Sequence, residues 1–122
     1  MVAVDIQSKM LEKLRRRASK RGLLERIETR LAAQDSTDLS NLRGKVDFAL
    51  AFAMVHEMPA AEPFFREAAE VLKPGAFLLL AEPRGHVKAA QFEAQLKAAS
   101  DAGLAVVKRP AIRGSHAVLL RK

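Results

Sequence analysis

The sequence predicts an α/β sandwich with a mainly parallel sheet that ends in an antiparallel hairpin. Two observations lead to this fold class. Strand-like stretches alternate with stretches whose apolar residues recur every three or four positions, as in amphipathic helices. Two of the strand-like stretches, VDFALAFAMV and AFLLLA, are almost wholly apolar, as expected of strands covered on both faces. The length of 122 residues suits a single domain, residues 1–122.

The first part of the chain predicts a strand, a helix and a second strand. Residues 2–6 form the first strand, and residues 7–21 form a helix that ends at Gly22. The inward positions of this helix are apolar: Met10, Leu11, Leu14 and Ala18. Residues 27–33 form the second strand. A polar connection, QDSTDLSNLRGK, follows and has room for one helical turn.

The rest of the chain predicts six elements, ending in two strands with no helix between them. They are a strand at 46–55, a helix at 63–72, a strand at 76–81, a helix at 87–102, and strands at 104–108 and 116–120. The residues expected inward on the two helices are Phe65, Ala69, Leu72, Phe92, Leu96 and Ala99. Because the last two strands follow each other directly, we expect them to pair antiparallel.

Composition limits where the protein acts. No apolar run approaches the roughly 20 residues of a membrane-spanning helix, and no signal-peptide pattern opens the chain. Cysteine is absent, which removes disulfides and thiolate chemistry and fits a reducing cytoplasm. We therefore expect a cytoplasmic protein that does not engage a membrane.

Basic residues give the chain a net charge of +7 and concentrate in the run KLRRRASKRG, at residues 13–22. On a helix these cations lie opposite the apolar residues. Such a face is more often solvated than bound to a partner, and we interpret it so. Nucleic acid binding stays open as an alternative, because phosphates are attracted to a patch of this kind.

Polar side chains follow the predicted strands at their carboxyl ends, where ligands of parallel α/β sheets bind. These residues are Asp5, Asp35, Ser36, His56, Glu57 and Glu82. Glu82 has two open interpretations, a carboxylate satisfied by its surroundings or a substrate contact. This edge of the sheet is the predicted site.

Three histidines, His56, His86 and His116, are expected at the same edge. His56 is the best candidate for a catalytic base, since imidazole exchanges protons near neutral pH. Three histidines also form the ligand set of some zinc sites. We interpret them as separate residues and expect no metal, because positions inferred from sequence carry errors of several residues.

At this point the sequence resembles the class I S-adenosylmethionine-dependent methyltransferases that act on small molecules. VAVDIQSKML resembles the second strand and helix of that family, and VDFALAFAMVHEMP resembles the fourth strand with its loop. FFREAAEVLKPGAFLLLAEP resembles the next helix, turn and strand. The family also ends in a strand that lies antiparallel between its two predecessors. The resemblance therefore implies a truncated Rossmann-like methyltransferase sandwich.

The resemblance implies S-adenosylmethionine as the cofactor and assigns six residues to it. Asp5 would hold the ribose hydroxyls, with Ile6 beside it. Asp35 and Ser36 would meet the adenine. Phe52 and Ala53 would lie near the methionine part. The implied activity is methyl transfer to a small-molecule substrate, with His56 acting where the acceptor must first lose a proton.

The sequence departs from the family at its start. The family's first strand, glycine-rich loop and first helix should precede Val2, so the fold begins one strand late. The six glycines are at least ten residues apart, so no GxGxG loop can form. The strands at 2–6 and 46–55 would then have unpaired edges. We expect these strands to pair directly or with a second chain, giving a homodimer with or without strand exchange.

Two functional hypotheses remain. The first is methyl transfer from S-adenosylmethionine to a small molecule, with the cofactor site completed by a second chain. The second is a non-catalytic scaffold or interaction module that has lost cofactor binding. The missing glycine loop favours the second hypothesis, and the presence of Asp5 and Asp35 favours the first.

Overall fold

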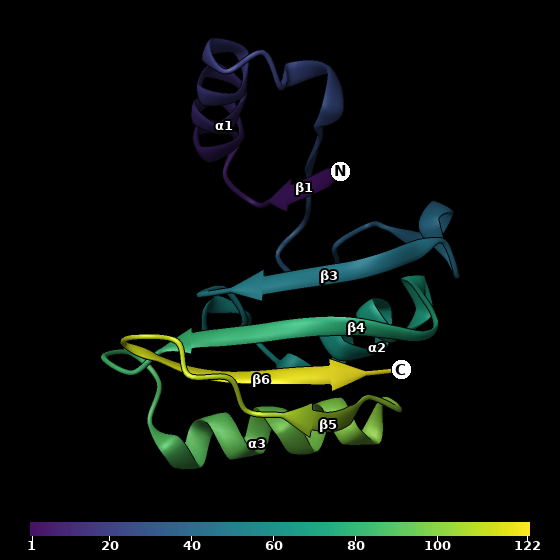
Figure 1. Ribbon diagram of the computed structural model, residues 1–122, viewed down its shortest axis with the longest axis vertical. Helices are drawn as coiled ribbons and strands as arrows, with labels where there is room; N and C mark the ends of the chain where they lie inside the picture. The colour runs from purple at the N-terminus through teal and green to yellow at the C-terminus, as the bar shows by residue number, and fades with distance from the viewer. The chain divides into compact units, whose positions relative to one another are not determined.

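The computed structural model describes residues Met1–Lys122 and divides into two compact units (Figure 1). Unit 1 is Met1–Asp38 and unit 2 is Leu39–Lys122. The strands form a two-stranded sheet, β1-β2, and a four-stranded sheet in the order β3-β4-β6-β5. None of the helices has the length and apolar character needed to cross a membrane.

Unit 1 contains one helix and a small parallel sheet. Its elements are β1 (Val2–Asp5), α1 (Ser8–Lys20), the 3₁₀ turn η1 (Leu24–Arg26) and β2 (Glu28–Leu31). β1 and β2 are paired from Val2 opposite Glu28 to Asp5 opposite Leu31. Both strands therefore end at the same edge, and the segments that follow them begin there.

The inward face of α1 differs from the prediction at one residue. Leu11 and Ala18 are buried and Leu14 is half-buried, but Met10 is 49% exposed. Consecutive helical residues are about 100° apart, so burial of Leu11 turns Met10 toward solvent. The cations predicted on the outer face are exposed: Arg15, Arg16, Arg17, Lys20 and Arg21.

Unit 2 contains the larger sheet and two helices. Its elements are η2 (Ser40–Leu42), β3 (Val46–Phe52), η3 (Val55–Glu57), α2 (Ala61–Val71), β4 (Leu72–Pro83), α3 (Ala89–Asp101), β5 (Ala105–Lys108) and β6 (Ser115–Arg121). β3 runs parallel to β4, whereas β6 is antiparallel to both β4 and β5. The predicted hairpin is confirmed, with its last strand between the two preceding strands (Figure 1). The polar connection, which has room for one helical turn, contains η2.

One face of the four-stranded sheet carries the hydrophobic core. Residues opposite each other in the register lie on the same face, and this face holds Ala51, Leu78, Leu80, Val118 and Leu120. These side chains are 1% exposed or less and pack against apolar residues of α2 and α3, including Phe65, Phe92 and Leu96. The predicted inward residues of both helices are therefore buried, but Leu72 belongs to β4, because α2 ends at Val71.

The other face of this sheet is apolar but open. On β3 it presents Phe48, Leu50 and Phe52, which are 53%, 61% and 55% exposed. Their register places the half-buried Phe77, Leu79 and Leu119 on the same face. The expectation that the strand at 46–55 is covered on both faces was wrong for unit 2, and the strand ends at Phe52. We call these six residues the open face.

The end of α3 supplies a test of backbone geometry. Gly103 has φ +92°, and the N–H of Leu104 donates to the Ala99 carbonyl at 3.0 Å, as in a Schellman C-cap. An alanine Cβ at this position would meet nothing within 4 Å. Only the left-handed conformation therefore penalises Gly103→Ala, and we expect a loss of about 1–2 kcal/mol in the free energy of unfolding.

Gly85→Ala is the matched control, because Gly85 has equally open surroundings and no positive φ. It should leave stability unchanged or raise it by about 0.4–1 kcal/mol through the unfolded chain. The chain has no Trp or Tyr, so urea unfolding is best followed by circular dichroism. Equal effects of the two substitutions would contradict the C-cap interpretation.

Candidate functional site

The loop after β3 turns sharply at Ala53. This residue has φ +55°, in the left-handed region that costs alanine about 1–2 kcal/mol. Its N–H donates to the Ala81 carbonyl at 2.8 Å, one step beyond the last pair of the β3–β4 ladder. The chain then enters η3, which places His56 just past the carboxyl end of β3.

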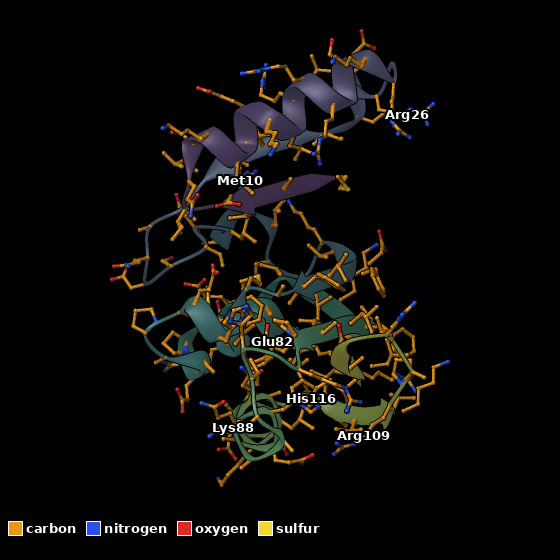
Figure 2. The ribbon with its side chains drawn as sticks, turned by 90° about the vertical axis from the view of Figure 1, so that its left-hand side faces the viewer. Met10, Arg26, Glu82, Lys88, Arg109 and His116 are labelled. Carbon is orange, nitrogen blue, oxygen red and sulfur yellow. The ribbon has the colours of Figure 1, made fainter.

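The carboxylate of Glu82, near the end of β4, organises this loop. Glu82 is 0% exposed, and Figure 2 shows it within the body of unit 2. Three consecutive backbone N–H groups donate to it, from Met54 at 3.1 Å, Val55 at 3.2 Å and His56 at 2.9 Å. A buried carboxylate is stable only where such donors replace water. Of the two interpretations of Glu82, the structure supports the carboxylate satisfied by its surroundings.

Two side chains complete the surroundings of Glu82. Nδ1 of His56 lies 3.0 Å from Oε2, and Nε2 of Gln95 donates to the same oxygen at 3.2 Å. Gln95 comes from α3 and is 8% exposed. Its Oε1 is the one buried side-chain nitrogen or oxygen without a partner in the structure. We call Glu82, His56 and Gln95, with the η3 backbone, the Glu82 cluster.

The three histidines have different surroundings. The ring of His86 stacks on that of His56, with centroids 5.7 Å apart and planes inclined by 12°. Nε2 of His116 instead contacts the Val87 carbonyl at 3.0 Å, and its ring stacks on Phe92. The described chain contains no group of three or more His, Cys, Asp or Glu residues that could hold a metal ion.

In unit 1 the predicted cofactor residues follow the carboxyl ends of β1 and β2. Oδ1 of Asp5 accepts the Gln7 N–H at 2.8 Å, and Ile6 is 45% exposed. Asp35 is exposed. The Ser36 hydroxyl accepts the N–H of Asp38 at 3.1 Å. Ile6 and Asp35 thus give unit 1 exposed apolar and polar surface after its two strands.

The structure thus assigns the predicted site residues to two groups. Asp5, Ile6, Asp35 and Ser36 belong to unit 1, whereas Phe52, Ala53 and His56 belong to unit 2. Within unit 2, Phe52 and Ala53 lead directly into the loop that carries His56. Glu57, also expected at this edge, is exposed at the end of η3.

The prediction missed Gln95. The available signal was a polar residue on the inward stripe of α3, between positions 92, 96 and 99, all of which are apolar. A lone buried amide on such a stripe needs a hydrogen-bond partner. Its partner, Glu82, is 13 residues earlier in the chain, so sequence spacing alone did not connect the two.

Comparison with known proteins bears on this site. Residues 1–80 match the family described as a methyltransferase domain. No curated protein gives a significant match to the sequence.

Many solved structures are similar in fold, and the three that follow each have a TM-score above 0.7. An S-adenosylmethionine-dependent methyltransferase from Aquifex aeolicus has a TM-score of 0.81 and 23% identity, over 98% of this chain and 67% of its own. The cyclase SpnF has a TM-score of 0.76 and 20% identity, over 89% of this chain and 44% of its own.

The third is geranyl diphosphate C-methyltransferase from Streptomyces coelicolor A3(2), in complex with Mg²⁺, geranyl diphosphate and S-adenosyl-L-homocysteine. Its TM-score is 0.72 and its identity 14%, over 98% of this chain and 62% of its own. The chain thus spans 44% to 67% of the length of these three proteins. At these identities the likeness concerns the fold.

The Glu82 cluster predicts a large loss of stability for Glu82→Gln. An amide nitrogen in place of either carboxylate oxygen would point N–H groups at backbone N–H groups, which cannot accept. Hydrogen bonds to charged groups contribute about 1.5–3 kcal/mol each and a buried unpaired donor costs about 1–3 kcal/mol, so we expect a loss of at least about 3 kcal/mol. Urea unfolding followed by circular dichroism measures it.

Glu93→Gln is the control, because Glu93 is an exposed glutamate on α3. The Arg109 guanidinium, which hydrogen-bonds with Glu93, lowers the pKa of that carboxyl. Water screens this pair, so its removal should change stability far less. A Glu82→Gln effect as small as that of Glu93→Gln would show that the buried carboxylate does not organise the loop.

Proposed function

Because the chain belongs to the methyltransferase domain family, whose cofactor is S-adenosylmethionine, we propose that it takes part in methyl transfer to a small molecule. The observation that carries this proposal is the fixed loop after β3. It presents Phe52, Ala53 and a histidine in sequence at the carboxyl end of a parallel strand, where ligands of such sheets bind.

The chemistry of the unit 1 residues fits the ribose and adenine parts of the cofactor. Asp5 uses Oδ1 to accept one backbone N–H, and the structure gives its second oxygen no partner. That oxygen suits vicinal hydroxyl donors. The exposed apolar side chain of Ile6 suits one face of the adenine ring, with Asp35 and Ser36 as polar neighbours of its edge.

In unit 2, side chains and carbonyl groups would contact the methionine part of the cofactor, and backbone N–H groups would not. The Ala53 N–H already donates to Ala81 and therefore cannot hold a ligand. Phe52, which is 55% exposed, offers apolar surface instead. When bound, S-adenosylmethionine supplies a methyl group activated by the sulfonium. The residues of the chain therefore have mainly to position the acceptor.

A second copy of the chain would complete the site in this proposal. β3 is an edge strand, and its open face carries Phe48, Leu50 and Phe52 without a covering element of unit 2. Long apolar edges of this kind favour pairing with another chain. Because the chain has no cysteine, we propose that this homodimer acts in the cytoplasm.

Cofactor binding is tested by calorimetric titration of the chain with S-adenosylmethionine. We expect saturable binding that Asp5→Ala weakens at least about tenfold, because a hydrogen bond to a carboxylate contributes about 1.5–3 kcal/mol. Glu25→Ala, which removes an exposed carboxylate of the same unit, should leave the affinity unchanged. No heat from a folded sample would refute cofactor binding and favour the scaffold hypothesis.

Self-association is tested by sedimentation at increasing protein concentration. The wild-type chain should dimerise, and Leu50→Lys should shift it to monomer, because this side chain is 61% exposed on the open face. Val107→Lys is the matched control on the other edge strand, where Val107 is 51% exposed. A monomeric wild-type chain at high concentration would rule out the second-chain site.

A further inference from the structure

We propose that Glu82 is a positioning residue that fixes the tautomer of His56, so that Nε2 accepts the proton of a hydroxyl-bearing methyl acceptor. This inference rests on the proposed function above and extends it to the class of acceptor. It depends on three features of the Glu82 cluster: the direction of its hydrogen bonds, the accessibility of Nε2 and the charge available near His56.

The direction of the hydrogen bonds follows from the surroundings of Glu82. Its two oxygens receive three backbone N–H groups and the Gln95 amide, all of which can only donate. The one group here that could accept a proton from Glu82 is Nδ1 of His56, and an imidazole is more basic than a carboxylic acid, so the proton belongs to the ring and the carboxylate accepts only. Nδ1 of His56, 3.0 Å away, must then carry the ring proton.

Nε2 is consequently a bare acceptor. The structure gives it no hydrogen-bond partner. It is also not buried, because the one buried side-chain nitrogen or oxygen without a partner is Oε1 of Gln95. Nε2 therefore remains accessible to a ligand, while 20% of the His56 side chain is exposed. The stacked ring of His86 restricts rotation of the imidazole from one side. Such a fixed, accessible lone pair is the geometry of a general base.

The class of methyl acceptor follows from the kind of proton that a neutral imidazole can remove. A thioether or tertiary amine has no proton to lose, so His56 would have no part in its methylation. A protonated amine arrives as a cation, and the carboxylate in contact with His56 is 0% exposed and occupied by donors. A neutral hydroxyl both donates to Nε2 and becomes a stronger nucleophile when its proton leaves.

The reaction balances in one step. The hydroxyl gives its proton to Nε2 and forms the new O–C bond with an oxygen electron pair, while the C–S pair leaves with sulfur as S-adenosylhomocysteine. His56 then holds a positive charge, which the adjacent Glu82 carboxylate stabilises. Transfer of this proton to water returns the ring to its neutral form.

Nitrogen NMR of the histidine rings tests the tautomer without cofactor. At a pH alkaline enough for neutral imidazoles, we expect His56 to be protonated at Nδ1 and bare at Nε2. His116 is the internal control, because its Nε2 faces the Val87 carbonyl and must carry the proton. Glu82→Gln should shift His56 toward the Nε2-protonated tautomer, while Glu93→Gln should leave it unchanged. Protonation of Nε2 in the wild-type protein would overturn the proposal.

Should Glu82→Gln fail to fold, Gln95→Met provides a second variant that keeps the carboxylate. It should preserve the Nδ1 tautomer, and a switch of tautomer in this variant would overturn the assignment to Glu82.

Phenol and anisole test the acceptor class in the same experiment. Phenol has a hydroxyl to donate and anisole does not, although their shapes are similar. Saturable displacement of the Nε2 resonance by phenol alone supports a hydroxyl acceptor, whereas equal effects or none overturn it. Neither measurement uses S-adenosylmethionine. Failure of the calorimetric titration would refute the proposed function without altering these results.

Discussion

Unit 2 depends on one buried charge. Moving a carboxylate out of water is costly unless hydrogen-bond donors take the place of the solvent. Glu82 meets that condition with groups from two places in the chain, namely the backbone and His56 side chain of residues 54–56 and the Gln95 side chain of α3. The ends of β3 and β4 and one helix are therefore held together by a polar contact, beyond the apolar core.

This constraint accounts for the strained turn before η3. Ala53 adopts a left-handed conformation that an isolated alanine avoids. The surrounding hydrogen bonds stabilise this conformation. The Ala53 N–H donates to the Ala81 carbonyl, and the next three N–H groups all donate to Glu82. Strain that is held in this way commonly accompanies functional loops. Here it brings His56 off the axis of β3 and toward the carboxylate.

The sequence predicted the order and type of the elements well, because their periodicity reports local structure directly. α3 is observed at Ala89–Asp101 within the predicted 87–102, and Gly103 follows it as expected. The end of β3 was misplaced by three residues, since AMV continues the apolar run and nothing in its composition signals a left-handed turn. Likewise, an apolar strand does not reveal whether one or both of its faces are covered.

The candidate site was predictable as a set of residues and not as a network. Strand-end positions identified His56 and Glu82, because the carboxyl ends of parallel strands meet at one edge. The contact between these residues joins positions 26 apart, and Gln95 enters from a helix that carries no motif. Long-range hydrogen bonds of this kind depend on the tertiary register, which residue spacing does not encode.

The two units differ in how far they are organised for binding. Unit 1 buries two apolar side chains, Leu11 and Ala18, and segments below about 40 residues rarely build a sufficient core alone. The hydrophobic cluster of unit 2, by contrast, is continuous and includes Phe65, Leu78 and Leu120. His56 is therefore oriented before any ligand arrives, whereas Asp5 and Asp35 lie on a weakly packed frame. A ligand that binds Asp5 and Asp35 would lose affinity through ordering unit 1, since immobilising loops and side chains opposes binding. A partner that stabilises unit 1 would raise affinity without adding a contact to the ligand.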